Sequence, residues 1–196
     1  MPKVAALLLI SVIIGVIIFM VLRNNFHFNR PEGLTAVYDN GAAHDINAFI
    51  DGDVHVRDSN TGNPTTVSLL SGGSIDTGLY AYDSSRVNIF GGSIGGKLGV
   101  YESCQVTLSG GVIGGDLDIR DNGLLIIDGS GFNYSLGNIP DANGILTGIL
   151  ASGEQINASF HISGNASVLL VPERATIALL GLGGLGLIRR KTILGS

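Results

Sequence analysis

Two uninterrupted apolar segments bracket a long central region in which apolar and polar residues alternate in short runs. Residues 4–22 hold nineteen positions without a charge, and residues 175–188 hold fourteen. At about 1.5 Å of rise per residue, the first segment can cross a bilayer as a helix, whereas the second spans only about 21 Å. The pattern therefore predicts a hydrophobic helix near each end of the chain.

The region between these segments repeats itself with a period of nineteen residues. The recurring positions hold Gly72, Gly91, Gly110 and Gly129, then Ile75, Ile94, Ile113 and Phe132, then Leu79, Leu98, Leu117 and Leu136. A fixed period of about twenty residues, with short alternating runs and Gly-Gly punctuation, is typical of stacked β-strand coils. The sequence therefore predicts an all-β fold, a small right-handed parallel β-helix or solenoid of nineteen-residue coils, flanked by N- and C-terminal hydrophobic helices.

Alternation within one coil predicts which side chains face the core, because each coil must stack like residues on like. The predicted inward residues are Leu98, Val100, Val106 and Leu108, and the predicted outward residues are Gly99, Tyr101 and Thr107. The Gly-Gly pairs at 72–73, 91–92 and 110–111 are predicted at corners that need a positive φ.

The chain divides into four predicted parts. Residues 1–25 are a signal peptide or signal anchor, and the length of the apolar run and the lack of an A-x-A site favour a retained anchor. Residues 26–48 are a stem or N-terminal cap, and residues 49–170 are an acidic β-solenoid ectodomain. Its last strands, where the period weakens, are expected to cap the stack. Residues 171–196 are a sorting or anchor segment.

Charge is distributed unevenly along the chain. All sixteen acidic residues lie between Glu32 and Glu173, where only four Lys or Arg residues oppose them, so this region has a net charge of −12. The other seven cations flank the apolar segments, as in membrane-inserted chains. A nucleic-acid partner is disfavoured because phosphate binding needs a basic face on the folded part. A divalent cation fits this charge better.

Four acidic residues recur at one position of the repeat. They follow the outward residues Arg57, Tyr82, Tyr101 and Arg120, and they are Asp58, Asp83, Glu102 and Asp121. Ordinary turn chemistry explains them, because such side chains bond nearby backbone N–H groups. A carboxylate ladder for Ca²⁺ is the alternative, although the nine-residue calcium-binding repeat is absent. No other cofactor is expected.

The remaining reactive side chains give no clear motif. Cys104 is the only cysteine, so it makes no internal disulfide, and we expect a small residue in the core or a turn. His44, His55 and His161 are far apart in sequence, and His27 falls in the predicted stem.

A second charged cluster is predicted on one strand. Asp116, Asp118 and Arg120 share its outward side, and Lys97 and Gly99 match them one coil back. A polysaccharide lyase or hydrolase would use paired carboxylates in such a place. A short solenoid without long loops has no substrate cleft, so an exposed, solvated face is the preferred interpretation.

The C-terminal residues carry three parts in order. Val171-Pro172-Glu173-Arg174 comes first, an apolar stretch beginning Ala175-Thr176 follows, and the basic triplet Arg189-Arg190-Lys191 ends it. This order resembles the PEP-CTERM sorting signal, with Arg174 in place of that motif's second proline. The resemblance implies recognition by an exosortase-type membrane enzyme in a bacterium with an outer membrane, often one that produces extracellular polysaccharide.

The sequence thus predicts an exported, membrane-associated protein of the cell surface or extracellular matrix, with a structural or adhesive role and no enzymatic activity. The alternative is a carbohydrate-active β-helix enzyme at the envelope. The expected partners are the exosortase-type enzyme, the lipid bilayer and an exopolysaccharide. The expected location is the envelope of a Gram-negative-type bacterium, first the inner membrane, then the periplasm, cell surface or exterior.

Overall fold

The described part of the chain is built from β-strands. The computed structural model describes residues 35–59 and 62–173, and over these ranges it contains sixteen strands and no helix. A membrane-crossing helix is accordingly not found within them. The all-β prediction is confirmed. The predicted hydrophobic helices and the basic triplet at residues 189–191 lie outside the described residues.

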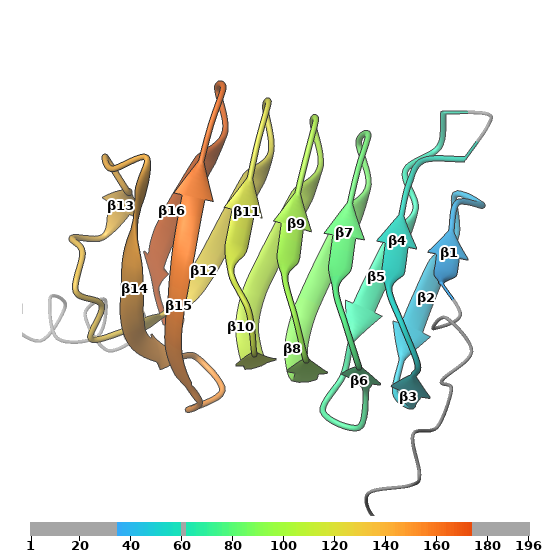
Figure 1. The fold of residues 1–196 in the computed structure, drawn as a ribbon, viewed down its shortest axis with the longest axis horizontal. Helices are drawn as coiled ribbons and strands as arrows, with labels where there is room; N and C mark the ends of the chain where they lie inside the picture. The colour runs from blue at the N-terminus through green and yellow to red at the C-terminus, as the bar shows by residue number, and fades with distance from the viewer. Residues whose placement is uncertain (1–34, 60–61, 174–196) are drawn as a thin grey trace, which may run out of the picture. The chain divides into compact units, whose positions relative to one another are not determined.

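Most strands belong to two rows of parallel neighbours (Figure 1). The first row contains β1 (Ala36–Tyr38), β4 (Val54–Val56), β7 (Leu79–Ala81), β9 (Leu98–Val100), β11 (Leu117–Ile119) and β15 (Gln155–Ile162). The second contains β2 (Ala43–Ile46), β5 (Thr66–Leu69), β8 (Arg86–Ile94), β10 (Gln105–Ile113), β12 (Leu124–Ser130) and β16 (Ser167–Pro172). The others are β3 (Phe49–Ile50), β6 (Ser74–Ile75), β13 (Gly137–Asn138) and β14 (Asn143–Leu150).

The pairing of the strands follows the period seen in the sequence. Leu79 lies opposite Leu98, and Leu98 lies opposite Leu117, so each step is nineteen residues. The second row shows the same step, because Val106 lies opposite Val87 and Leu125. Earlier in the chain the step varies, with Val54 opposite Leu79 and Thr66 opposite Arg86.

The core lies between the two rows. The four predicted inward residues are fully buried: Leu98, Val100, Val106 and Leu108. Burial of each such side chain contributes about 1.5–3 kcal/mol relative to leaving it in water. Tyr101 and Thr107 are partly exposed on the outer side, as predicted, whereas the outward position Gly99 is buried. The reason for that burial lies in the side chain of Tyr101, described below.

The positive φ predicted for the Gly-Gly pairs is present in two of the pairs, which lie inside strands, and absent from the third. Gly92 and Gly111 have φ values of +77° and +91°, in β8 and β10, and β10 shifts its register near its Gly-Gly pair. Neither Gly72 nor Gly73 has a positive φ. Gly73 is needed for space instead, because a Cβ atom there would overlap the carbonyl oxygen of Ile46.

The two rows are joined after β12. Strands β14 and β15 form an antiparallel hairpin, in which β15 continues the first row beside β11 and β14 lies antiparallel to β12. Residues 144–170 therefore connect the two rows, and the sheet nearly closes on itself there. At the other end, β1 and β2, from the segment predicted as a stem or cap, pair in parallel with β4 and β5.

Candidate functional site

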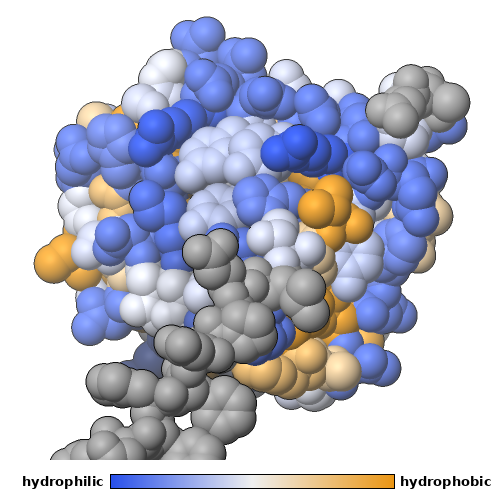
Figure 2. Space-filling view, turned by 45° about the vertical axis from the view of Figure 1, so that its right-hand side comes forward, coloured by the Kyte–Doolittle hydropathy of each residue, from blue (hydrophilic) through white to orange (hydrophobic). Residues whose placement is uncertain are grey.

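A band of aromatic and charged side chains covers the outer side of the first row. We call it the β4–β11 face, and it comprises Asp53, His55, Arg57, Tyr80, Tyr82, Lys97, Tyr101, Asp116, Asp118 and Arg120. Three of the four Lys and Arg residues within the described ranges belong to it. Figure 2 shows near-neutral surface in the middle of the view, with strongly hydrophilic residues on both sides. An acidic region thus gathers its cations on one face.

Two glycines let tyrosine rings lie down against the sheet. A Cβ atom on Gly99 would come within 2.7 Å of Cε2, Cζ and the hydroxyl oxygen of Tyr101, so the ring covers this position. Tyr80 covers Gly78 in the same way. The two rings are nearly parallel, at 14°, with centroids 6.4 Å apart. Together the two rings cover the outer side of β7 and β9.

The aromatic surface continues along the row and is bordered by arginines. The ring of His55 stacks with Tyr80 at 5.1 Å and with Tyr82 at 5.7 Å. The guanidinium of Arg57 lies over the Tyr82 ring, at 4.9 Å from its centroid. Burial, and secondly the positive charge of Arg57, lower the pKa of His55. His55 is therefore a neutral aromatic ring at neutral pH.

Asp118 is the most deeply buried charge on this face, with 3% of its surface exposed. Arg120 donates to it twice, from Nε to Oδ1 and from Nη2 to Oδ2, each at 2.8 Å. The hydroxyl of Tyr101 at 3.0 Å and Nζ of Lys97 at 3.3 Å also donate to Oδ2. Burial acts to raise the pKa of Asp118, but hydrogen bonds from Arg120, Tyr101 and Lys97 outweigh it, and the pKa is lowered.

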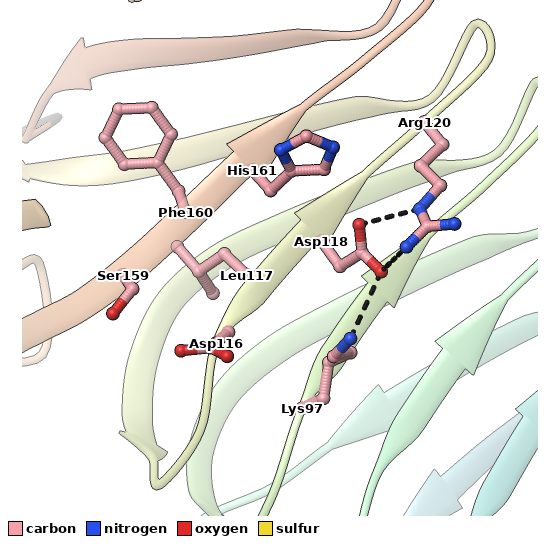
Figure 3. Close-up of a pocket in the computed structure, with 8 residues that line it drawn as sticks. All are labelled: Lys97, Asp116, Leu117, Asp118, Arg120, Ser159, Phe160 and His161. Carbon is pink, nitrogen blue, oxygen red and sulfur yellow. Dashed lines mark hydrogen bonds and ion pairs between the residues drawn. The ribbon is translucent and has the colours of Figure 1, made fainter. Parts of the chain in front are cut away.

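A hollow of about 250 Å³ opens beside Asp118 (Figure 3). It is lined by Lys97, Asp116, Leu117, Asp118, Arg120, Ser159, Phe160 and His161. Figure 3 shows Lys97 and Arg120 reaching Asp118 from different sides, with His161 near the carboxylate. Nδ1 of His161 lies 2.5 Å from the side-chain oxygen of Asn143, which accepts its hydrogen. The hollow therefore presents donors and acceptors side by side.

This chemistry suits binding better than acid–base catalysis. A general acid needs a raised pKa, and a general base needs a free lone pair aimed at the substrate. Asp118 has neither, because its pKa is lowered and both of its oxygens accept hydrogen bonds from neighbouring side chains. Lys97 and Arg120 keep 40% and 51% of their side-chain surface exposed, so both can donate to a further ligand.

No relative supplies a function for this face. Comparison with protein-family models, with curated proteins and with solved structures found no match to the chain. The geometry of the β4–β11 face and the resemblance of the C-terminal residues to a sorting signal are therefore the grounds for a functional proposal.

The structure brings the predicted cluster together but corrects its environment. Asp118, Arg120 and Lys97 lie within hydrogen-bonding distance, as their places in the repeat predict. The predicted solvated face is wrong for Asp118, which is buried beneath its partners. Ser159 and His161 were not predicted to join the cluster. The residue opposite Leu117 is Phe160 in β15, forty-three residues later, whereas the repeat predicts a step of nineteen. Only the lost period after residue 144 hints at such an insertion.

The column Asp58, Asp83, Glu102 and Asp121 links neighbouring turns through hydrogen bonds. Asp83, Glu102 and Asp121 have φ values of +57°, +57° and +60°, so each occupies the left-handed region of a turn. The carboxylate of Glu102 accepts the backbone N–H of Asp83 at 2.7 Å. Asp83 and Asp121 accept the backbone N–H of Asp58 and Glu102 at 3.2 and 3.4 Å. Turn chemistry thus explains the column, with side-chain hydrogen bonds to the backbone of the preceding turn.

Metal binding finds no support in this column. Within residues 35–59 and 62–173, no group of three or more His, Cys, Asp or Glu side chains is arranged to hold a metal ion. The carboxylates of Asp83, Glu102 and Asp121 instead each accept a backbone N–H group of the preceding turn. The arrangement of these carboxylates therefore does not support the Ca²⁺ ladder that the sequence left as an alternative.

Cys104 is buried, with its thiol donating to the carbonyl oxygen of Ala81 at 3.3 Å. Burial is the main reason that its pKa is raised to about 12. We expect the folded protein to react with a thiol reagent at pH 8 about a thousandfold more slowly than the chain in denaturant, since thiolate is the reactive form. Absorbance of the released chromophore measures both rates. Equal rates would contradict the buried position.

The predicted sorting motif begins inside the last strand. Val171 lies opposite Asp128 and Pro172 lies opposite Gly129, both in the parallel pairing of β16 with β12. The backbone N–H of Glu173 donates to the carbonyl oxygen of Gly129 at 3.2 Å. Arg174 lies outside the described residues, as do Arg189, Arg190 and Lys191. The first two residues of the motif are thus part of the sheet.

Proposed function

We propose that this protein is an exported structural or adhesive component of the cell surface or extracellular matrix, sorted by its C-terminal signal. The observation that carries the adhesive role is the β4–β11 face, which gathers aromatic rings and both signs of charge over four neighbouring coils. The acidic surroundings keep such a domain soluble outside the cell. The residues near Asp118 suit binding, so an enzymatic role is not proposed.

The fold proposed for this role is a small right-handed parallel β-solenoid. The step of nineteen residues that recurs from β7 to β11 in the first row and from β8 to β12 in the second supports it, since each coil then places its strands on those of the coil before. Right-handed crossovers join parallel strands in about 98% of cases, which supports the handedness. Such a stack presents the same outer side of successive coils as one continuous surface.

The proposed sorting rests on the three ordered parts at the C-terminus. An apolar stretch of about 21 Å inserts shallowly, and the basic triplet stays on the cytoplasmic side. Glu173 and the acidic domain then lie outside. The proposed partners are an exosortase-type membrane enzyme and the lipid bilayer, in the envelope of a bacterium with an outer membrane. The hydrophobic segment at residues 4–22 would serve as the export signal.

The intact mass of the protein recovered from its native cells tests this proposal. We expect the loss of residues after the Val171-Pro172-Glu173 motif, and an increased processed fraction in Arg174→Pro, which restores the second proline of the motif. Replacing Arg189, Arg190 and Lys191 together with Gln should leave more of the protein unprocessed. An unchanged C-terminus in both the unmodified protein and Arg174→Pro would show a plain membrane anchor instead.

A further inference from the structure

The hollow beside Asp118 and the rings of Tyr80 and Tyr101 form one continuous surface. Asp118 joins them, because the same carboxylate accepts the hydroxyl of Tyr101 and Nζ of Lys97. Tyr101 lies over Gly99, the residue opposite Asp118 in the neighbouring strand. Tyr80 lies beside Tyr101 in the next coil. A ligand seated in the hollow would thus extend directly onto the aromatic surface.

We propose that this surface is a binding site for a neutral polysaccharide, with sugar hydroxyl groups in the hollow and the apolar side of a sugar ring on Tyr80 and Tyr101. This inference rests on the proposed adhesive role and names its ligand class. Sugar recognition needs adjacent donors and acceptors, since each hydroxyl group donates one hydrogen bond and accepts others. The hollow supplies the donors Lys97 and Arg120 and the acceptor Asp116.

The charges of the hollow select a neutral ligand. Lys97 and Arg120 are balanced by Asp116 and Asp118, so the hollow itself carries no net charge. The central region around it has a net charge of −12, given its sixteen acidic and four basic residues, and would repel a polyanion. A cationic ligand would be repelled by Lys97 and Arg120, which line the hollow. Uncharged hydroxyl groups avoid both penalties.

The flat tyrosines explain why a sugar chain fits better than a peptide. The two rings are nearly parallel, at 14° to one another, and each covers a glycine of its own segment, so together they offer a continuous aromatic surface. Aromatic rings offer apolar area with a negative face that attracts the C–H groups of a pyranose ring. The hydroxyl ends of the tyrosines remain polar, so the surface does not need an apolar partner. Glycines at 78 and 99 are required for this arrangement, since a side chain would lift the rings.

Binding can be measured with the full chain in detergent and three neutral probes, dextran, laminarin and galactomannan, with the polyuronate alginate as the charged comparison. Intrinsic fluorescence reports it directly, because the chain has no Trp and three of its five Tyr residues lie on the β4–β11 face. We expect saturable binding of at least one neutral probe, with a dissociation constant that changes little as salt is raised. Binding of alginate alone, or of none of the four probes, would overturn the proposal.

Variants locate the site. Tyr80→Ala and Lys97→Gln should each weaken binding by about fivefold, from the loss of one ring contact or one hydrogen bond. Phe90→Ala is the matched control, because Phe90 is 53% exposed on β8 in the other row. It should bind as the unmodified protein does. Lys97→Gln changes an exposed side chain and is expected to stay folded. Unchanged binding in folded Tyr80→Ala and Lys97→Gln would place the ligand elsewhere.

The two proposals fail separately. Processing of the C-terminus is measured by mass and does not depend on the β4–β11 face. If the C-terminus is processed but no neutral polysaccharide binds, the proposal of a sorted surface protein stands and the proposed ligand is wrong. If a neutral polysaccharide binds but the C-terminus is retained, the proposed ligand stands and the proposed sorting is wrong.

Discussion

Gly92→Val is expected to destabilise the folded protein by about 3–5 kcal/mol, because valine meets both backbone strain and a steric clash. Gly92 has a φ of +77°, a conformation that β-branched residues rarely adopt. Its Cβ atom would lie 2.6 Å from the carbonyl oxygen of Leu70 and closer still to that of Gly73. Thr107→Val, on the outer side of β10, should change the free energy of unfolding by less than about 0.5 kcal/mol. Chemical denaturation followed by circular dichroism measures both.

Two further glycines separate the strain from the clash. Gly131 has a φ of +63°, and a Cβ atom added there would meet no neighbouring atom within 4 Å, so Gly131→Val reports strain alone. Gly95 has no positive φ, but a Cβ atom there would overlap the carbonyl oxygen of Asp76, so Gly95→Val reports the clash alone. Each should be less damaging than Gly92→Val. Equal stability of Gly92→Val and Thr107→Val would show that the positive φ and the close packing at Gly92 are assigned wrongly.

The regular part of the strand pairing could be predicted because its physical requirement is simple. Neighbouring parallel strands bury like residues beside like, so strands that are equally spaced in sequence place the same residue type at equal steps, as Leu79, Leu98 and Leu117 do. The first strands depart from this rule because the segments that connect them are longer, and Val54 pairs with Leu79 across twenty-five positions. A period reveals a register only where the loops between strands are equally long.

The strands after residue 144 could be predicted only in part. Alternating apolar residues after residue 144 indicate strands, and β14 and β15 are present. Their antiparallel pairing and the return of β15 to β11 depend on contacts between residues far apart in sequence, for which alternation carries no signal. The repeat consequently does not predict that His161 and Ser159 line the hollow.

The burial of Asp118 follows from a detail that alternation hides. A glycine at an outward position normally leaves its neighbours in solvent, but Gly99 makes room for the ring of Tyr101. That ring brings its hydroxyl to Asp118 and excludes water from one side of the carboxylate. The signal was an outward glycine two residues before a tyrosine, repeated at Gly78 and Tyr80.

Asp118→Asn is expected to lower the free energy of unfolding by about 2 kcal/mol at neutral pH. The carboxylate accepts four hydrogen bonds, two of them from Arg120, and hydrogen bonds to a charged group contribute about 1.5–3 kcal/mol. Asparagine keeps the shape but turns an NH₂ group toward these donors. The loss stays below that of a fully buried pair because Lys97 and Arg120 can be rehydrated. Asp116→Asn, an exposed neighbour in the hollow, is the control and should change stability by less than about 0.5 kcal/mol.

The pH dependence of that difference identifies its cause. Hydrogen bonds hold the pKa of folded Asp118 below its ordinary value of 3.8 despite burial, so the carboxylate stabilises the fold fully above that value. Its contribution is lost as the pH falls through the lowered pKa, because protonation then removes the charge in the folded protein too. The gap in unfolding free energy between the unmodified protein and Asp118→Asn should therefore stay constant from neutral pH down to about pH 4 and narrow below it. A gap that persists unchanged in stronger acid would mean that the substituted asparagine disturbs packing, and that the charge of Asp118 does not hold Tyr101, Lys97 and Arg120 in place.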